Sequence, residues 1–324
     1  MSRFLVTGSS GHLGDALVRV LRTTGHEVVG LDVVASPSTT IVASITDRGA
    51  VRRALDGVTA VLHTATLHKP HVGSHTRQEF VDVNVTGTLT LLEAATETGV
   101  GSFVFTSSTS VFGCALTPGP GEPAAWITED VVPQIRNVYG ATKLAAEHLC
   151  ELAAHDGLPV VVLRAARFFP EQDDRADVRA TYDAANLKVN EFLYRRVDLA
   201  DVVDAHLLAA EHAPDLGFGR YIVSATTPFT RTDLAELGTD APAVVDRLFP
   251  DEMRRYRAWG WRMFPALDRV YVNERARRDL GWAPRHDFRS AVELVATDGD
   301  PRSPLAREVG VKGYHPLPTG VYTR

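Results

Sequence analysis

Short apolar runs recur along the chain, and longer segments with helical periodicity separate them. The runs are rich in Val, Ile, Leu and Phe, and they occupy residues 3–7, 27–32, 58–63, 102–106, 159–164 and 220–224. None alternates cleanly between apolar and polar positions, which is typical of strands buried on both faces of a parallel sheet. Because these strands alternate with helices through right-handed crossovers, the pattern predicts an α/β fold with a doubly wound parallel sheet.

Two later stretches, 168–194 and 226–269, lack this alternation. They follow predicted strands, so we expect them to contribute to a smaller C-terminal cap over the carboxyl edge of the sheet. Four Gly and four Pro after residue 297 predict an irregular tail. The predicted sheet domain comprises residues 1–167 and 195–225. The predicted cap comprises residues 168–194 and 226–297, and the tail comprises residues 298–324.

Composition and charge argue against several classes of protein. The 324 residues are 44% hydrophobic and 23% charged, as in ordinary globular proteins. The 34 basic and 40 acidic residues give a net charge of −6, without the basic excess typical of nucleic-acid binding. No apolar run approaches the roughly 20 residues of a membrane span. The first predicted strand begins too early to leave room for a signal peptide. The two cysteines, Cys114 and Cys150, cannot form a framework of disulfides. We therefore expect a cytoplasmic protein.

Three glycines mark the turn between the first strand and the first helix, in Val6-Thr7-Gly8-Ser9-Ser10-Gly11-His12-Leu13-Gly14. Gly8 permits a tight turn, Gly11 lets backbone amides approach a pyrophosphate, and Gly14 lets the helix pack close to the strand. The amino end of the helix then offers free N–H groups and a positive dipole to the phosphates. The segment therefore predicts a dinucleotide-binding site.

Asp32 ends the second predicted strand, 18 residues after Gly14. A carboxylate at this place can accept hydrogen bonds from the adenosine ribose hydroxyls, and it repels a 2′-phosphate. No Arg or Lys follows in Val33-Val34-Ala35-Ser36. The coenzyme is therefore expected to be NAD rather than NADP.

Further motifs accompany the glycine turn, whose spacing is Gly-x-x-Gly-x-x-Gly. They are His63-Thr64-Ala65-Thr66, Asn84-Val85-Thr86-Gly87-Thr88, the serine-rich segment 106–113, Tyr139-Gly140-Ala141-Thr142-Lys143 and Leu280-Gly281-Trp282-Ala283-Pro284. Together they resemble the extended short-chain dehydrogenase/reductases, in the NAD-dependent epimerase/dehydratase branch that includes UDP-galactose/glucose 4-epimerases. The resemblance implies a Rossmann fold, bound NAD, a substrate-binding cap, and a homodimer formed through helices near residues 76–98 and 139–154.

Ser108, Tyr139 and Lys143 are the candidate catalytic residues. Tyr139 and Lys143 are four residues apart, which places them on one face of a helix. An ammonium there is expected to lower the tyrosine pKa, so that a phenolate can take a proton from a substrate hydroxyl while hydride leaves the carbon. Ser108 would hydrogen-bond the same substrate oxygen. By resemblance, Tyr139 and Lys143 also contact the coenzyme.

The resemblance adds further coenzyme contacts, residue by residue. Ser44 stands where the family often has Asp, and His68 stands where 4-epimerases have a lysine. His63, His68, His71 and His75 crowd one segment, but no cysteine or carboxylate completes a metal site, so none is expected. The expected coenzyme contacts are His12, Leu13, Val33, Ser44, Ile45, Thr64, Ala65, Thr66, His68, Asn84 and Thr106.

The substrate end departs from several family patterns. Thr109-Ser110 stands where sugar-nucleotide dehydratases carry an Asp-Glu pair, which disfavours dehydration. After the fifth strand the family often has the motif Leu-Arg-x-x-Asn, whose asparagine touches sugar nucleotides. If the motif begins at Leu163, Arg167 replaces that asparagine. A second register, starting at Arg167, stays open. A guanidinium facing the cleft would suit a carboxylate or phosphate. The expected substrate contacts are Thr109, Arg167, Asn186 and Arg196, with Arg195, Arg262 and Arg269 as further candidates for phosphate.

Three hypotheses follow for the function. The first is an NAD-dependent epimerase that acts on a sugar or nucleotide-sugar secondary hydroxyl through a transient ketone. The second is an NAD-dependent dehydrogenase or reductase of a small secondary alcohol. The third is a non-catalytic NAD-binding protein, which predicts loss of a member of the Ser–Tyr–Lys set, yet all three members are present.

Overall fold

The computed structural model describes residues 2–173 and 175–312, and its centre is a seven-stranded sheet in the order β3-β2-β1-β4-β5-β7-β8. Every neighbouring pair in this sheet is parallel, which confirms the predicted doubly wound α/β fold. The strands are β1 (Arg3–Thr7), β2 (Glu27–Asp32), β3 (Ile41–Val42), β4 (Ala60–His63), β5 (Ser102–Ser108), β7 (Val160–Ala165) and β8 (Phe218–Val223).

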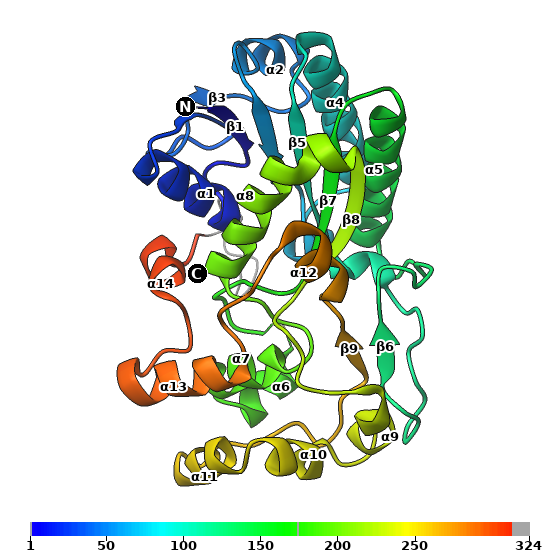
Figure 1. The fold of residues 1–324 in the computed structure, drawn as a ribbon, viewed down its shortest axis with the longest axis vertical. Coiled ribbons are helices and arrows are strands. Elements are labelled where there is room, and N and C mark those ends of the chain that lie inside the picture. The colour runs from blue at the N-terminus through cyan, green and yellow to red at the C-terminus, as the bar shows by residue number, and fades with distance from the viewer. Residues whose placement is uncertain (1, 174, 313–324) are drawn as a thin grey trace.

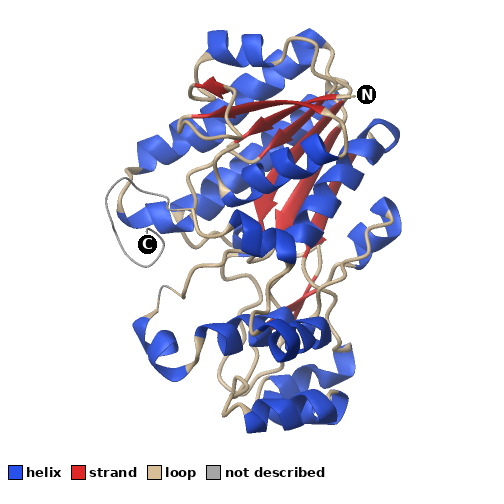
Figure 2. Ribbon diagram, turned by 90° about the vertical axis from the view of Figure 1, so that its left-hand side faces the viewer, coloured by secondary structure: helices blue, strands red, loops and turns tan. Residues whose placement is uncertain are grey.

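Helices cover both faces of the sheet (Figure 2). The first layer packs through Leu17 and Val202 and comprises α1 (His12–Thr23), α8 (Leu199–Leu216), α12 (Glu274–Leu280) and α14 (Pro304–Val309). The second packs through Val51 and Leu91 and comprises α2 (Arg48–Ala54), α4 (Gly87–Thr98) and α5 (Val138–His155). A short helix α3 (Arg77–Val81) and a π-helical turn (Asp82–Thr86) lead into α4.

The order of the strands reverses at β1, which pairs with β2 on one side and with β4 on the other. In open α/β sheets, ligands bind outside the carboxyl ends of the strands at such a switch point. Thr7 and His63 end these two strands, and the Thr7 hydroxyl lies 2.7 Å from His63 Nδ1. This buried contact holds the two strand ends together beneath the candidate site.

A smaller unit extends beyond the carboxyl edge of the sheet, in the lower part of Figure 1. It has its own core, in which Tyr256 and Phe288 pack together. Its helices are α6 (Ala176–Thr181), α7 (Ala184–Phe192), α9 (Leu234–Leu237), α10 (Ala241–Leu248), α11 (Pro250–Ala258) and α13 (Phe288–Asp298). The loop between β5 and α5 has four prolines within residues 115–137 and is called the proline-rich loop. A parallel pair of short strands, β6 (Ala125–Ile127) and β9 (Arg269–Tyr271), joins it to this unit. Helix α12 instead packs on α8 and β8, so that part of the expected cap segment lies with the sheet.

The expectation of an irregular tail is wrong for residues 304–309, which form α14 against α1 and α8 (Figure 1). Ser303 caps this helix by accepting from the Ala306 amide at 3.2 Å, and Ala306 and Val309 are buried. Proline in the first helical turn suits a helix start, so Pro304 does not prevent the helix. The last part of the expected tail, 313–324, lies outside the described residues. None of the described helices combines the length and the apolar character needed to cross a bilayer.

Candidate active site

The glycine turn after β1 has the geometry predicted for it. Gly8 has φ +70°, and a Cβ there would lie 2.7 Å from the Ala65 amide nitrogen. A Cβ on Gly14 would lie 2.0 Å from the Gly8 carbonyl oxygen, so the first turn of α1 needs glycine to approach β1. Gly11 is the N-cap and supplies no side-chain cap to the free amides of the helix. The turn therefore leaves a helix amino end able to receive a diphosphate.

Asp32 is fixed at the end of β2 by two backbone donors. The Ser10 amide donates to Oδ2 at 3.0 Å, and the Val34 amide donates to Oδ1 at 2.9 Å. A carboxylate has about four acceptor sites, so these contacts leave capacity for ribose hydroxyls. The residue lies on the wall of the same cavity as the glycine turn, which fits an adenosine ribose there.

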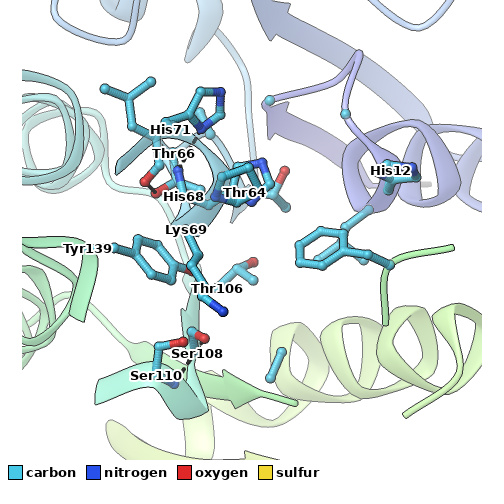
Figure 3. A pocket seen from close by; sticks show the side chains of 18 of the residues that line it. His12, Thr64, Thr66, His68, Lys69, His71, Thr106, Ser108, Ser110 and Tyr139 are labelled. Carbon is cyan, nitrogen blue, oxygen red and sulfur yellow. Dashed lines mark hydrogen bonds between the residues drawn. The ribbon is translucent and has the colours of Figure 1, made fainter. Parts of the chain in front are cut away.

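One cavity of about 720 Å³ runs from the glycine turn to the carboxyl end of β5. In Figure 3, Tyr139, Ser108 and Thr106 lie on one side of it and His12 on the other. Most of the predicted contacts line this cavity: Gly8, Gly11, His12, Leu13, Gly14, Asp32, Val33, Ser44, Ile45, Thr64, Ala65, Thr66, His68, Thr106, Ser108, Thr109, Tyr139 and Arg167.

Tyr139 reaches Ser108 because α5 begins close to the end of β5. Asn137 caps α5 by accepting from the Gly140 amide at 2.9 Å. A Cβ on Gly140 would lie 2.8 Å from the Ser110 carbonyl oxygen, so glycine permits this approach. The Ser108 hydroxyl lies close enough to the Tyr139 phenol to lower the tyrosine pKa, and Ser108 Oγ accepts from the Ser110 amide at 3.1 Å. Both residues line the same cavity.

The expected effect of Lys143 on the Tyr139 pKa is wrong for this structure. Burial raises the pKa of Tyr139 to about 12, and the hydrogen bond with Ser108 only partly opposes that rise. Lys143 is buried behind the cavity wall, and its ammonium lies 4.1 Å from the Phe105 ring centroid. Burial lowers the pKa of Lys143 to about 7, although Cys150 and Glu147 oppose this shift. Desolvation therefore outweighs the hydrogen-bonding contribution at Tyr139 and the coulombic contributions at Lys143.

Glu147, which the sequence reasoning missed, continues the spacing of Tyr139 and Lys143 along α5. Its buried carboxylate accepts from Arg164 Nη2 at 2.8 Å and from Ser107 Oγ at 2.6 Å. Arg164 is thereby directed into the protein, whereas Arg167 lines the cavity. This arrangement agrees with the register set by Leu163.

Asn84, Asn186 and Arg196 were predicted to contact ligands, but none of them lines the cavity. Asn84 instead braces the loop after β4, since its Oδ1 accepts from the Leu67 amide at 2.8 Å. Asn186 is held in the cap, where its Oδ1 accepts from the Arg262 amide at 3.1 Å. Arg196 is buried and donates to Glu191 and to a backbone carbonyl. Their polar groups are directed toward the protein, which periodicity alone could not show.

Several charged residues line the cavity. Arg195 and Arg269, which the sequence reasoning considered for phosphate, line the cavity together with Arg136 and Asp268. Arg269 Nη2 donates to the Thr117 hydroxyl at 3.0 Å, which ties it to the proline-rich loop. Arg136 lies three residues before Tyr139, a position that could have been noticed in the sequence. Within residues 2–173 and 175–312, no group of three or more His, Cys, Asp or Glu side chains is placed to hold a metal ion.

His206 is a second residue that the sequence reasoning missed. It lies on α8, and its Nδ1 donates to the Val202 carbonyl at 2.8 Å. Burial lowers the pKa of His206 to about 4, so the ring is neutral and its Nε2 accepts from the Thr106 hydroxyl at 2.8 Å. This contact fixes the Thr106 side chain in the cavity wall, beside Ser108.

Comparison with known proteins gives a consistent family assignment. The family model described as the NAD dependent epimerase/dehydratase family matches residues 4–223. A solved structure of a short-chain dehydrogenase/reductase superfamily protein from Agrobacterium tumefaciens, with bound NAD, is 25% identical. It has a TM-score of 0.65, and the alignment covers 94% of this chain and 97% of the other.

The curated relatives differ in their printed activities. Sterol demethylase protein B of Methylococcus capsulatus is 33% identical, over 64% of this chain and 65% of the relative. A 3-beta-hydroxysteroid dehydrogenase of Mycolicibacterium neoaurum is 27% identical over 88% and 87% of the two chains. A UDP-glucose 4-epimerase of Corynebacterium glutamicum is 26% identical over 90% and 94%. The similarity thus extends to enzymes named for steroids and for nucleotide sugars.

Proposed function

Because this chain belongs to the NAD-dependent epimerase/dehydratase family of extended short-chain dehydrogenase/reductases, and its coenzyme is NAD, we propose that it epimerises a secondary hydroxyl of a sugar or nucleotide sugar. The substrate hydroxyl would be oxidised to a ketone and then reduced on its other face. The observation that carries this proposal is that Ser108 and Tyr139 lie close together in the wall of the cavity that also contains the glycine turn and Asp32.

The roles of the side chains follow from this pair. Bound NAD supplies the hydride acceptor. As the phenolate, Tyr139 would take the hydroxyl proton during oxidation, and the resulting phenol would return that proton to the ketone oxygen during reduction. Because burial raises the pKa of Tyr139 to about 12, the phenolate is the minor form at neutral pH. Ser108 donates to the same oxygen and stabilises developing negative charge. Lys143 lies on the helix that carries Tyr139 but behind the cavity wall, and its proposed contact with the nicotinamide ribose rests on the family resemblance.

The charged wall of the cavity supports a polar substrate over a steroid. Arg136, Arg195, Arg269 and Asp268 line this cavity. Burying an apolar ring system against these groups would desolvate them without replacing their hydrogen bonds, which is unfavourable. Hydroxyl, carboxylate or phosphate groups would satisfy them instead. Arg167 lines the same cavity, and it also binds Asp173 and Glu191.

A second candidate is an NAD-dependent dehydrogenase of a small secondary alcohol. It uses the same Ser108, Tyr139 and Lys143, and the relative named 3-beta-hydroxysteroid dehydrogenase, aligned over 88% of this chain, favours it. The two candidates differ in whether reduced coenzyme leaves after each oxidation. A non-catalytic NAD-binding role gives no reason for the intact Ser–Tyr–Lys set.

The test is to incubate the purified protein with NAD and with UDP-glucose, UDP-galactose, glucose or glucuronate in turn. An epimerase should form a new sugar isomer, detected by NMR, without a net rise in the absorbance of reduced coenzyme. Reduced coenzyme formed in step with a ketone product would instead establish the dehydrogenase. The Tyr139→Phe variant controls for contaminating enzymes, since it should give neither signal.

The homodimer implied by the family resemblance is part of the same proposal. Helices α4 and α5, which would form its interface, pack against each other within one subunit, and Leu152 on α5 is 55% exposed. Light scattering should give twice the subunit mass of 35.2 kDa. A monomer at all concentrations would contradict this part of the proposal.

A further inference from the structure

The segment after the cap returns to the glycine turn. Helix α14 packs on α1 and α8, and the Ser303 amide that precedes it donates to Asp198 Oδ2 at 3.0 Å. Three residues beyond α14, Lys312 lines the cavity that contains Gly11, and its backbone amide donates to His12 Nε2 at 3.2 Å. The chain is thus anchored on the sheet domain before it reaches the expected diphosphate site.

Lys312 meets a buried acidic residue next to the expected diphosphate site. Asp15 lies in the first turn of α1 and is only 4% exposed. A carboxylate there interacts well with the helix dipole, but it would repel a diphosphate bound at the same helix end. Lys312 Nζ donates to Asp15 Oδ2 at 2.6 Å, and Arg19 Nε donates to the same oxygen at 3.0 Å. The two cations together offset the charge of Asp15.

The electrostatics of Asp15 agree with this arrangement. Burial raises the pKa of Asp15, but hydrogen bonds from Lys312, Ser38 and Arg19 more than compensate and lower the pKa below its usual value. Asp15 is therefore ionised at neutral pH. Arg19 also pairs with Glu308 on α14 at 2.7 Å, and it does not line the cavity. Of these two cations, Lys312 is the one beside the coenzyme site.

We propose that Lys312 is a coenzyme-binding residue that neutralises Asp15 and presents its ammonium to the diphosphate of NAD. The segment 303–312 would then act as a strap that closes this end of the site. The side chain of Lys312 is 23% exposed and reaches Asp15 from the cavity side, so a short movement would bring it to a phosphate oxygen. The proposal needs only that NAD binds, and it holds for an epimerase and for a dehydrogenase alike.

Calorimetric titration of the full chain tests the proposal without measuring activity. The ligands are NAD, ADP-ribose, which keeps the diphosphate, and adenosine, which lacks it. Lys312→Met should lower the affinity for NAD and for ADP-ribose by about tenfold or more, as expected for loss of a charged hydrogen bond. The affinity for adenosine should stay unchanged. Lys312→Arg should restore most of the affinity, because it keeps the positive charge.

Arg19→Met is the matched control, since Arg19 binds the same Asp15 oxygen and also the strap. It should change the affinity for NAD less than Lys312→Met does. Equal losses in the two variants would show that only the charge of Asp15 or the docking of the strap matters, and they would overturn a phosphate contact by Lys312. An unchanged affinity in Lys312→Met, or an equal loss for adenosine, would also overturn it. Thermal unfolding of each variant confirms that the titrated protein is folded.

Discussion

The ammonium of Lys143 lies 4.1 Å from the centroid of the Phe105 ring, in the interior between α5 and β5. The ring face attracts the cation, but it does not replace the water that the ammonium has lost. Burial therefore lowers the pKa of Lys143 to about 7, even though Cys150 and Glu147 raise it. The lysine that the proposed chemistry requires is therefore held in the folded protein at a cost to stability.

This cost predicts a pH dependence of stability. Between the folded pKa of about 7 and the usual value of 10.5, the unfolded chain binds a proton that the folded protein does not. The contribution of Lys143 to the free energy of unfolding therefore rises with pH in this window, and it is least favourable below pH 7. Lys143→Met should stabilise the protein most at the low-pH end of this window. It should also reduce the rise of the free energy of unfolding with pH.

Urea unfolding at several pH values measures this effect. Tyr139→Phe is the control, because it leaves Lys143 in place and should keep the rise with pH. The explanation fails if Lys143→Met and the natural sequence show the same pH dependence.

Loss of the Tyr139 hydroxyl should affect chemistry far more than binding. Tyr139→Phe removes the group that exchanges a proton with the substrate oxygen, which typically slows turnover by about 10²–10⁴-fold. Calorimetry should find NAD affinity changed less than about tenfold, since the glycine turn and Asp32 remain. Ser108→Ala should also slow turnover, because a donor to the developing alkoxide is lost. Near-normal turnover in Tyr139→Phe would exclude the proposed role.

Glu147 should matter for stability because it is fully buried between two arginines. Its carboxylate binds Arg164 at 2.8 Å and Arg220 at 3.1 Å. Glu147→Gln leaves buried guanidinium charge without its partner, which should reduce the free energy of unfolding by about 3–5 kcal/mol. Glu151→Gln is the matched control, since Glu151 pairs with Arg220 near the surface and should cost about 1 kcal/mol or less. Similar losses in the two variants would contradict this account.

Asp32 should determine the choice of coenzyme. Asp32→Asn removes the negative charge that repels a 2′-phosphate, while it keeps an acceptor for the Ser10 or Val34 amide. The preference for NAD over NADP should therefore fall by about tenfold or more, measured as the ratio of the two dissociation constants. An unchanged ratio would place the ribose away from Asp32.

The hydrophobic pattern identified most of the sheet but not the strands of the cap. Short apolar runs identified β1, β2, β4, β5, β7 and β8, because strands buried on both faces have few polar positions, whereas the two-residue edge strand β3 was missed. The short pair β6 and β9 was missed, since each strand has three residues and their pairing joins segments 125–127 and 269–271. Helix α14 was missed because glycines and prolines around it resemble a tail, whereas Ser303 and packing on α1 stabilise it.

The sequence by itself determined the coenzyme turn and the identities of Ser108, Tyr139 and Lys143, because these depend on residue type and on spacing within single elements. Tertiary structure decided which polar side chains face the cavity and which are directed inward, as for Arg167 and Arg164. It also decided that burial dominates the pKa shifts of Tyr139 and Lys143, and that Lys312 comes to lie beside His12, 300 positions earlier. Desolvation and long-range contact depend on how distant segments pack, and no local pattern in the chain records that packing.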